Sequence, residues 1–585
     1  MRVDNARRLT GPGFFAPRSG AAVELWVEAA EQRDAVMQRW TPLLDKLLDL
    51  LGLLRSERFH HVHMAGFTTA VTAPIDRCVA LADALEWAGL HLAGQTSVTL
   101  SEAVHAFHDA IPGEADPRLT GFERAARTHG VPFLWDDDHV SIGLGAHSKT
   151  WPARELPDFT SESFDWAPYL PRIPVGLVTG TNGKTTTTRM TAAILRQAGH
   201  RVGASSTDAI TLDGLVIEEG DWTGPGAARK VLRHPEVTAA VLETARGGIL
   251  RRGLAFDDAD AAIVTNVGAD HFGEYGITTV EEMANVKAVV WQGVREGGKR
   301  IANVGCPVTA AHVHANLPEV IGHEDWVLIA RDPGSPTLHL HLEAGGEGWT
   351  VVGQALTHVR GPLADHRNHV RVATINEIPA TFGGTAIHNI DNALAAAALG
   401  HALGVAHPVI GLALAGFGAS PDDNPGRIER YDLDGVTLLL DFAHNAHGLL
   451  ALAPTVAHLR KPGSRLFIGI GQAGDRSIAD LDSLAAATLA LDPHDIIVRP
   501  MPGYERGRTL DEMVQMITSA FERVGFAKDH LSTATDEVDV LEQAVSRASP
   551  GDLIVLLVHY QRVEVRAWLA ERNQAQSSPG NVAAP

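Results

Sequence analysis

The feature that most constrains this 585-residue chain is a glycine-rich turn that follows an apolar run and opens a helical stretch. Residues 173–179 form the apolar run, the turn reads Gly180-Thr-Asn-Gly-Lys-Thr185, and residues 184–198 have helical spacing. Backbone N–H groups in such a turn, together with the helix N-terminus, bind phosphate groups. We therefore predict a nucleotide site in which Lys184 neutralises the β and γ phosphates and Thr185 offers its hydroxyl to Mg²⁺. The common G-x-x-x-x-G-K-[ST] spacing would need glycine at Val178, so this turn is a shorter variant.

The alternation of apolar runs with helical stretches predicts a parallel α/β sheet around this turn. Further buried strands are expected at residues 239–242 and 261–266. From about residue 424 the same alternation returns and predicts a second, smaller doubly wound sheet. Its expected strands are 437–441, 466–470, 495–499 and 553–558, and its expected helices include 477–490 and 509–524.

Residues 1–156 have a mixed pattern that predicts an α+β domain, with a strand at 21–29 and helices at 40–54, 75–92 and 122–128. Residues 157–172 contain prolines and acidic residues without a clear period, and we interpret them as a linker. The predicted domains are therefore 1–156, the nucleotide-binding domain 173–423, and 424–572, followed by a frayed tail at 573–585.

The composition excludes several classes of function. The chain has 49 Lys and Arg against 70 Asp and Glu, a formal charge of −21, which repels nucleic acid and anionic lipid. We therefore expect neither a nucleic-acid nor a membrane partner. The two cysteines, Cys78 and Cys306, are too few for a disulfide framework, which favours the reducing cytoplasm as the location.

Polar residues follow two of the predicted central strands. Glu243 ends one apolar run, and Asn266 ends the next, with Asp270 and His271 just beyond. Because the carboxyl ends of parallel strands meet at one edge of a sheet, Glu243 and His271 are expected to reach a metal held by the nucleotide. Oxygen and imidazole ligands suit Mg²⁺ or Mn²⁺ there. The alternative for Glu243 is a cap on the following turn.

Histidines elsewhere give a weaker signal. His60, His61 and His63 lie in an expected strand or loop, where alternation would place His60 on the opposite face from the other two. His105 and His108 are about one turn apart on an expected helix. A metal site at either group is weighed against ordinary surface or core histidines.

Seven segments of the chain form a specific combination. They are GTNGKTTTT, LETARGGILRRGL, TNVGADHFGEYG, Lys287, Asn389-Ile-Asp-Asn392-Ala-Leu-Ala, Pro425-Gly-Arg427 and Asp441-Phe-Ala-His-Asn445. Together they resemble the Mur ligase superfamily, most closely the Mur-like half of cyanophycin synthetases, over roughly residue 173 to the end. The resemblance implies a central Mur-type ATPase domain and a Rossmann-like C-terminal domain.

The N-terminal region is similar to the first domain of cyanophycin synthetases. The similarity is carried by Arg7-Arg8-Leu-Thr-Gly-Pro12 and Ile142-Gly-Leu-Gly-Ala-His-Ser-Lys149. In those enzymes the second stretch leads into an ATP-grasp domain, whereas here a short linker leads directly to the phosphate turn. We therefore expect one ATP site in this chain.

The resemblance implies a ligase that uses ATP and Mg²⁺: a carboxylate is phosphorylated to an acyl phosphate, and an amine then displaces phosphate to give an amide. It assigns the catalytic roles to Lys184, Asn266, His271 and Lys287. Lys287 matches a position that is carbamylated in many Mur ligases. The implied metal ligands are Thr185, Glu243 and His271. The implied nucleotide contacts are Gly180, Thr181, Asn182, Gly183, Lys184, Thr185, Thr186, Asn392, Arg427 and Asp441.

Two segments depart from the family pattern. Asn303-Val-Gly-Cys306 stands where Asn-Ala-Asp-Asp is usual, which puts a local structural or nucleotide contact in doubt. Val558-His559-Tyr560-Gln561 replaces an ending common in murein ligases and argues against a murein substrate. Substrate carboxylates are expected to meet guanidinium groups, with surface arginines as the alternative. The substrate-binding candidates are Arg246, Arg251, His444, Asn445 and Arg506.

The sequence therefore predicts an ADP-forming ligase that joins an amino acid or other amine to a carboxylate of an amino acid, peptide or polyaspartate-like acceptor. The alternative is a regulatory partner of a fuller cyanophycin-type synthetase. Folylpolyglutamate-like and murein-like ligases are less favoured because of the N-terminal similarity. We also expect a homo-oligomer, and the acceptor could be the product of a separate synthetase partner.

Overall fold

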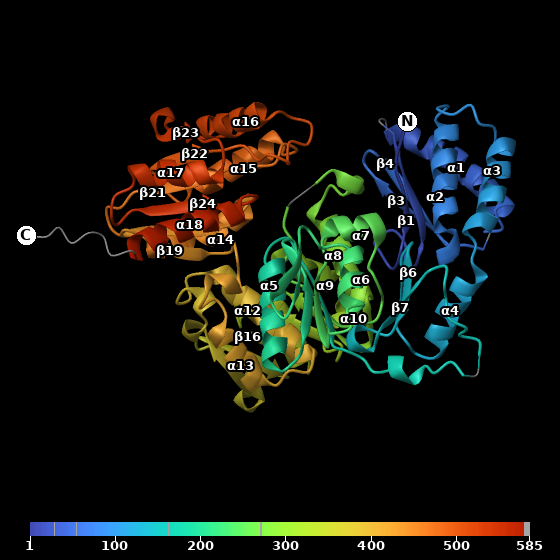
Figure 1. Ribbon diagram of the computed structural model, residues 1–585, viewed down its shortest axis with the longest axis horizontal. Coiled ribbons are helices and arrows are strands. Elements are labelled where there is room, and N and C mark those ends of the chain that lie inside the picture. The colour runs from blue at the N-terminus through green and yellow to red at the C-terminus, as the bar shows by residue number, and fades with distance from the viewer. Residues whose placement is uncertain (28–29, 54, 162, 270–271, 578–585) are drawn as a thin grey trace, which may run out of the picture. The chain divides into compact units, whose positions relative to one another are not determined.

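The computed structural model describes residues 1–27, 30–53, 55–161, 163–269 and 272–577 (Figure 1). The chain divides into two compact units. The first comprises Met1–Thr374 and Asp391–Leu414, and the second comprises Ile375–Ile390 and the chain from Ala415.

The first unit begins with a four-stranded antiparallel sheet in the order β1-β2-β4-β3. Helices α1 and α2 lie on one face of this sheet and α3 packs against α2 (Figure 1); Trp40 of α1, Leu85 of α2 and Phe67 of β4 are buried between the helices and the sheet. The strand expected at 21–29 is shorter, and the helix expected from residue 40 begins ten residues earlier, because Val36 also joins the core. The elements are β1 (Arg2–Leu9), β2 (Gly20–Trp26), α1 (Ala30–Leu50), β3 (Arg58–His63), β4 (Gly66–Thr72), α2 (Cys78–Leu92) and α3 (Leu100–Glu114).

A smaller sheet and an aromatic cluster follow. Helix α4 (Pro117–Thr128) precedes the antiparallel strands β5 (Phe133–Trp135), β6 (His139–Ile142) and β7 (Lys149–Pro152). The next segment, interpreted from sequence as a linker, packs its rings on buried Phe122: Phe159 stacks at 4.9 Å and Trp166 lies at 5.9 Å between ring centroids. This segment therefore has irregular backbone but belongs to the core of the unit.

An eleven-stranded sheet forms the centre of the first unit, in the order β11-β10-β9-β12-β8-β13-β14-β15-β16-β17-β18. The strands from β9 to β16 are parallel, as the sequence predicts, and antiparallel strands extend both edges. The strands are β8 (Val175–Thr179), β9 (Val202–Ser205), β10 (Ala209–Leu212), β11 (Leu215–Glu219), β12 (Ala239–Glu243), β13 (Ala259–Val264), β14 (Val294–Asn303), β15 (Trp326–Ile329), β16 (Glu347–Val352), β17 (Ala355–Arg360) and β18 (His369–Thr374).

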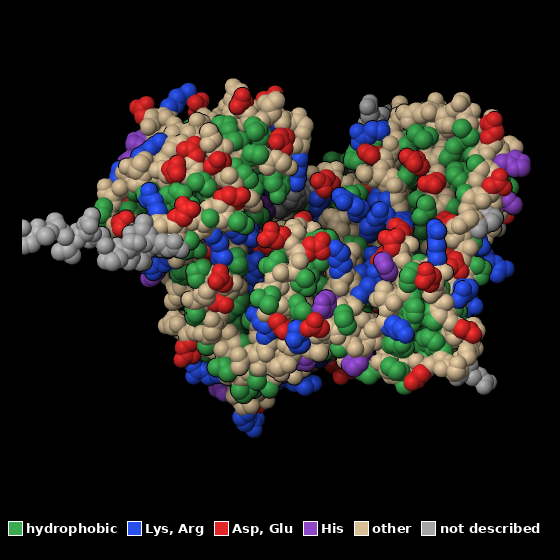
Figure 2. Space-filling model, viewed as in Figure 1, with side chains coloured by type: hydrophobic (Ala, Val, Ile, Leu, Met, Phe, Trp, Pro, Cys, Tyr) green, Lys and Arg blue, Asp and Glu red, His purple; other side chains and the backbone are tan. Residues whose placement is uncertain are grey.

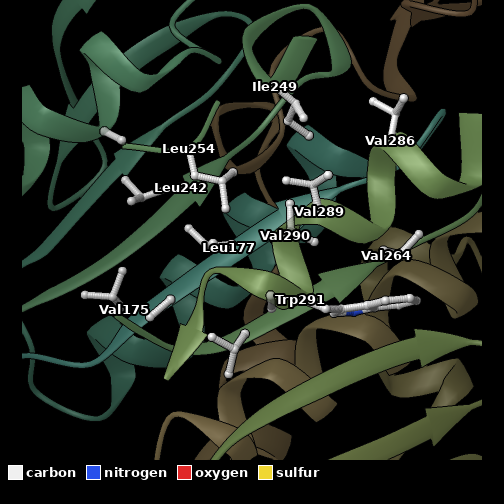
Figure 3. Close-up of a cluster of buried hydrophobic side chains, with 14 of the residues drawn as sticks. Val175, Leu177, Leu242, Ile249, Leu254, Val264, Val286, Val289, Val290 and Trp291 are labelled. Carbon is white, nitrogen blue, oxygen red and sulfur yellow. The ribbon is translucent and has the colours of Figure 1, made fainter. Parts of the chain in front are cut away.

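The parallel strands are buried on their faces by connecting helices, which is why they read as continuous apolar runs. Figure 3 shows Leu177 of β8, Leu242 of β12 and Val264 of β13 in one cluster with Val289 and Trp291 of α8. The helices are α5 (Lys184–Gln197), α6 (Pro225–Leu232), α7 (Arg246–Arg252), α8 (Val280–Gln292), α9 (Pro307–Ala315), α10 (Leu317–Val320), α11 (Pro336–Glu343), α12 (Ile387–Ala402) and α13 (His407–Gly416).

The arginine-containing segment at the end of β1 fastens the N-terminal sheet to helix α7. Arg7 donates to the Leu250 carbonyl at 3.1 Å and forms an ion pair with Glu24 at 3.0 Å, both side chains being buried. The Thr10 N–H donates to the Arg252 carbonyl at 2.8 Å. A Cβ at Gly11 would lie 2.3 Å from the Leu254 carbonyl oxygen, so the close approach requires glycine there.

The second unit contains a six-stranded sheet in the order β19-β20-β24-β21-β22-β23, parallel except for β19. Its strands and helices follow the predicted doubly wound pattern, and apolar residues cover both faces. The strands are β19 (Glu429–Leu433), β20 (Val436–Asp441), β21 (Leu466–Ile470), β22 (Asp495–Val498), β23 (Leu531–Thr533) and β24 (Leu553–Leu557). The helices are α14 (Ala446–Leu459), α15 (Ile478–Leu489), α16 (Leu510–Arg523), α17 (Glu537–Arg547) and α18 (Arg562–Ser577).

The surface carries charges of both signs. Acidic and basic side chains are interspersed over the face shown in Figure 2. Within the described ranges, no helix has the length and apolar character needed to cross a bilayer.

Candidate nucleotide site

The glycine-rich turn lies between β8 and α5, as predicted. Gly183 precedes the first residue of α5 with φ of 81°, a left-handed conformation that glycine adopts without strain. A Cβ at this position would lie 2.2 Å from Oδ1 of Asn392 on α12. The ammonium of Lys184 donates to the Thr181 carbonyl at 3.1 Å, so the lysine folds back over the turn.

Asn266, two residues after the neighbouring strand β13, holds the turn. Its Oδ1 accepts from the Asn182 N–H at 3.0 Å, and its Nδ2 donates to the Asn182 carbonyl at 2.9 Å. Its own carbonyl accepts from the Thr181 N–H at 2.9 Å. Gly180 completes this contact, because a Cβ there would lie 1.9 Å from the Thr265 hydroxyl. Asn266 therefore fixes the shape of the phosphate turn.

Glu243 lies behind the turn at the end of β12, where it is 2% exposed. The Thr185 hydroxyl donates to its Oε2 at 2.8 Å, and the Thr207 hydroxyl donates to its Oε1 at 2.7 Å. A buried carboxylate with adjacent hydroxyl oxygens is the hard donor set that Mg²⁺ prefers, so these residues fit a divalent cation. Thr207 is missing from the sequence-based prediction, although it follows β9, the strand beside β12.

The remaining predicted residues of the first unit are placed as follows. Lys287 is 4% exposed on α8, which packs against β13 and β8. Thr186 is buried in the first turn of α5, and the Thr187 hydroxyl lies 3.5 Å from Oδ1 of Asn392. His271, the predicted metal ligand, lies outside the described residues.

Two substrate-binding candidates sit on α7 and contact the segment that follows β13. Arg246 forms an ion pair with Glu274. The Arg251 Nε donates to the Tyr275 hydroxyl at 3.4 Å, which raises the pKa of Arg251. In this structure both guanidinium groups contact protein side chains.

The segment that begins at Asn303, which departs from the family pattern after its first residue, has a structural role that the sequence left open. Nδ2 of Asn303 donates to the Thr265 carbonyl at 2.8 Å, and its Oδ1 accepts from the Gly305 N–H at 3.0 Å. The Cys306 sulfur lies 3.4 Å from the Val267 nitrogen. This segment therefore supports the loop that carries Asn266.

The candidates in the second unit gather mainly at the turn after β20. Asp441 accepts from the Ile428 N–H at 3.0 Å and the Ala443 N–H at 2.8 Å. The Arg427 guanidinium lies 4.0 Å from the centre of the Phe442 ring. Two further candidates contact the same turn: His444 Nδ1 lies 3.2 Å from the Phe442 carbonyl, and Asn445 caps α14.

Arg506 is separate from this turn in sequence and lies in the loop before α16. It forms an ion pair with Asp475. Its φ is 44°, an unusual left-handed conformation for a residue with a long side chain.

The chain matches two known domain families in the regions that form these sites. Residues 178–322 match the Mur ligase middle domain, and residues 426–557 match the Mur ligase, glutamate ligase domain. In these two regions the chain is therefore similar to Mur ligases.

Curated relatives include cyanophycin synthetases. The enzyme from Crocosphaera subtropica is 35% identical over 385 residues, which covers 66% of this chain and 42% of the relative. That from Synechocystis sp. is 36% identical over 387 residues, with the same coverage of 66% and 42%. The chain thus spans less than half the length of these relatives. A UDP-N-acetylmuramoyl-L-alanyl-D-glutamate--2,6-diaminopimelate ligase of Chlorobium phaeobacteroides is 26% identical over 65% of this chain and 70% of that protein.

Solved structures that are similar to part of the chain include FolC of E. coli in complex with ADP. That structure has a TM-score of 0.47 and 20% identity, and the match covers 68% of this chain and 90% of that one. A pseudomurein peptide ligase type C from Methanothermus fervidus has a TM-score of 0.43 and 18% identity over 68% of this chain and 79% of that one.

Proposed function

We propose that this chain is an ATP-dependent, ADP-forming ligase that joins an amine to a carboxylate. The observation that carries the proposal is the phosphate turn at Gly180–Thr185 with Glu243 hydrogen-bonded directly behind it through Thr185. A glycine turn at a helix N-terminus binds phosphates, and the carboxylate behind it can hold the accompanying cation. The two Mur ligase domains and the cyanophycin synthetase relatives support the same chemistry.

The first step transfers the γ-phosphoryl group of ATP to the acid. A carboxylate oxygen attacks the γ-phosphorus, the bond to the bridging oxygen breaks, and ADP leaves. Lys184 and the backbone of residues 180–185 hold the phosphates, and Asn266 orients the turn beside the transferred group. Thr185, Glu243 and His271 would hold Mg²⁺, which supplies charge neutralisation. Positioning and charge stabilisation are what phosphoryl transfer needs from a protein.

The second step forms the amide. The amine nitrogen attacks the acyl carbon and loses a proton, and phosphate leaves with the oxygen that came from the acid. We propose that Lys287 takes part as a carbamate, which is an anion able to bind a second cation. Its burial on α8 supports this, because a carbamate formed in a site closed to bulk water is protected from exchange.

Recognition of the nucleotide and the substrates involves further residues in our proposal. Asn392, Arg427 and Asp441 bind the nucleotide, and the acid and amine are held by the substrate-binding candidates. The acceptor is an amino acid, a peptide or a polyaspartate-like chain. The substrate-binding candidates are Arg246, Arg251, His444, Asn445 and Arg506.

Three expectations about context stay predictions. They are a homo-oligomeric assembly, a separate synthetase that supplies the acceptor, and a cytoplasmic location. Size-exclusion chromatography with light scattering tests the first. Activity on a product made by a purified synthetase tests the second.

The experiment that tests the proposed function measures phosphate release from ATP and Mg²⁺ across pairs of amino acids, aspartyl dipeptides and short polyaspartate acceptors. We expect release only when an acid and an amine are both present, with a product heavier than the acid by the amine minus water. Lys184→Ala should lower release by about 10²–10³-fold, whereas Lys230→Ala, on a surface helix, should leave it unchanged. Release that is independent of the amine, or equal in the Lys184 variant, would contradict the proposal.

A further inference from the structure

Three histidines that are distant in the sequence meet at the edge of the central sheet. His358 lies on β17, His401 in the last turn of α12 and His407 at the start of α13. Figure 1 shows α12, α13 and β16 in one part of the molecule. One nitrogen from each histidine lies within 4.8 Å of those of the other two. We call these residues the three-histidine cluster.

Two of the rings are already oriented by acceptors outside the cluster. Nε2 of His358 lies 3.3 Å from Oε1 of Glu347 on β16, and Nδ1 of His401 lies 3.4 Å from the Val405 carbonyl. A histidine whose one nitrogen donates to a carboxylate or carbonyl presents the other nitrogen as a lone pair, which is the arrangement around most protein-bound metals. Nδ1 of His358 and Nε2 of His401 are therefore the nitrogens available to a cation.

The third ring faces the first. Nε2 of His407 lies 3.0 Å from Nδ1 of His358, and the His401 and His407 rings stack at 4.4 Å between centroids. Because Nε2 of His358 faces the Glu347 carboxylate at 3.3 Å, we infer that His358 carries its proton on Nε2 and that His407 donates the hydrogen bond between the two rings. The cluster thus brings one nitrogen from each of the three imidazoles close together, and a single proton lies between Nε2 of His407 and Nδ1 of His358.

The surroundings favour the neutral form of His401 and His407. Burial, and then the neighbouring His401 and His358, lower the pKa of His407 to about 4. Burial and His358 also lower the pKa of His401. Trp349 packs against all three rings, with centroids 5.0, 5.9 and 5.8 Å away. His358 is 8% exposed, whereas His401 and His407 are partly exposed and leave a route from solvent.

Glu347 is itself held in the charged state. Its burial would raise its pKa, but the hydrogen bond from His358 and the charge of Lys299 outweigh this and lower the pKa to about 2. Lys299 Nζ lies 3.5 Å from the other carboxylate oxygen. The result is a carboxylate that points at a histidine and is balanced by a cation on its far side.

We propose that His358, His401 and His407 form a binding site for a borderline-soft divalent cation, Zn²⁺ being the best match, with Glu347 orienting His358. Imidazole ligands suit Zn²⁺, at nitrogen to metal distances of about 2.0–2.1 Å, whereas Mg²⁺ and Ca²⁺ prefer oxygen. Binding replaces the hydrogen bond between His407 and His358 with coordinate bonds to Nε2 of His407 and Nδ1 of His358. The proton on Nε2 of His407 moves to Nδ1 of the same ring, so the three ligands stay neutral. The site does not depend on the proposed ligase activity.

The location suggests a structural role. Helix α12 also carries Asn392, which contacts α5 near the phosphate turn and lies about 14 Å along the helix from His401 at 1.5 Å per residue. A cation bound to the cluster ties the far end of α12 to α13 and β17. Zn²⁺ should therefore raise the thermal stability of the first unit, because a ligand that binds only the folded state stabilises it.

A second group of potential ligands provides a matched control. His494, Asp495 and His530 of the second unit also bring ligand atoms within 4.8 Å of one another, but His494 is exposed. Oδ2 of Asp495 is 2.6 Å from Nδ1 of His494, so this group is already an ion pair when the histidine is protonated. The three-histidine cluster should bind a transition metal in preference to this group.

The test is calorimetric titration of chelator-treated full-length protein with Zn²⁺ in excess Mg²⁺, together with the visible spectrum of the Co²⁺-loaded protein. We expect one tight site with a tetrahedral Co²⁺ spectrum, lost in His407→Ala and in His401→Gln. His494→Ala and the exposed His339→Ala should retain it. Glu347→Gln should weaken Zn²⁺ affinity by about 10–100-fold, the usual effect of removing an orienting partner.

Three results would overturn the proposal. One is no Zn²⁺ binding by the wild-type protein in excess Mg²⁺. Another is binding that survives both His407→Ala and His401→Gln. The third is a site that disappears in His494→Ala. Two cluster variants are included so that failure of one to fold does not decide the matter, and circular dichroism checks the fold of each.

Discussion

The two parallel sheets of this chain place functional candidates at the same edge, the carboxyl ends of the strands, but they build that edge differently. In the central sheet the edge is a glycine turn that leads directly into the N-terminus of α5 at Lys184. In the C-terminal sheet the equivalent turn after β20 reads Asp441-Phe-Ala-His-Asn445, and the edge is built from side chains. The first edge is suited to binding an anionic group of a ligand, whereas the second edge already contains charged side chains of the protein.

Two charges at the second edge, Arg499 and Glu537, are buried and paired. Arg499 and Glu537 are both 0% exposed, and their charged atoms are 2.5 Å apart. Arg499 also donates to the Leu557 carbonyl at 2.8 Å, and its Nη2 lies 2.9 Å from Nδ1 of His559. Glu537 accepts from the N–H groups of His559 and Gln561 at 2.6 and 2.7 Å. The unusual ending at residues 558–561 is therefore held in place by this ion pair.

The comparison predicts that breaking the buried ion pair between Arg499 and Glu537 at the second edge reduces stability, whereas changing Lys184 in the phosphate turn at the first edge reduces activity. The largest expected effect is Arg499→Met, which leaves Glu537 as a buried charge without its partner. Breaking a buried pair costs about 3–5 kcal/mol. Chemical denaturation should show this loss in the second unit.

Two further variants check that assignment. Arg523→Met removes an exposed ion pair with Asp482 and should cost at most about 1 kcal/mol. The double variant Arg499→Met with Glu537→Gln should recover part of the loss, because no unpaired charge remains. If Arg499→Met were as mild as Arg523→Met, the second edge would not be a stabilising network.

The next effect in size is on catalysis at the first edge. Lys184→Ala should lower the rate of ATP-dependent phosphate release by about 10²–10³-fold, the usual effect of removing one group that stabilises transition-state charge. The midpoint of unfolding should stay close to that of the wild-type protein, because the ammonium donates to the Thr181 carbonyl of its own turn and does not fasten the turn to another element through that bond. Steady-state kinetics and thermal unfolding on the same sample measure both. A large loss of stability would show that the two edges do not differ as proposed.

An effect of intermediate size on both stability and ATP binding is expected at Asn303, which hydrogen-bonds to the loop that carries Asn266. Asn303→Ala leaves the buried Thr265 carbonyl without its donor, which costs about 1–3 kcal/mol and should also weaken ATP binding through the Asn266 loop. Asn303→Asp keeps the oxygen that accepts from Gly305 but loses the donor, so it should behave like the alanine variant. Wild-type ATP affinity in both variants, measured by calorimetry, would separate Asn303 from the nucleotide site.

The smallest expected effect is a pH dependence of the folding stability of the second unit. Burial, followed by the charge of Arg499, lowers the pKa of His559 well below 6.5. The folded state therefore binds fewer protons than the unfolded state just below pH 6.5, so its stability falls as the pH drops below that value and is full above it. His559→Asn should flatten this part of the stability profile. An unchanged profile in the variant would assign the dependence to other groups.

Much of this architecture can be predicted from local patterns. The strand Leu466–Ile470 is predicted to the residue, and β8, β12, β20 and α5 within two, because apolar runs bounded by turn residues identify buried parallel strands. The antiparallel strands β17 and β18 are not predicted. Their residues mix polar and apolar side chains, and they form strands by pairing, β17 with β16 and β18 with β17.

The features that the sequence does not reveal depend on distant contacts. Thr207 reaches Glu243 only because β9 lies beside β12. The segment interpreted as a linker is held by Phe159 and Trp166 on Phe122, in a core with no regular spacing. The three-histidine cluster joins residues from β17, α12 and α13, whereas the sequence draws attention to the adjacent histidines of β3.

The measurement that tests the central claim most directly follows a carboxylate oxygen. The acid substrate is labelled with heavy oxygen in its carboxylate, and the inorganic phosphate formed with ATP, Mg²⁺ and the amine is analysed by mass spectrometry. Our account predicts one labelled oxygen in each phosphate released, since the acid oxygen leaves with phosphorus when the amide forms. Unlabelled phosphate accompanying amide formation would show that the acid is not activated by phosphorylation and would contradict the account.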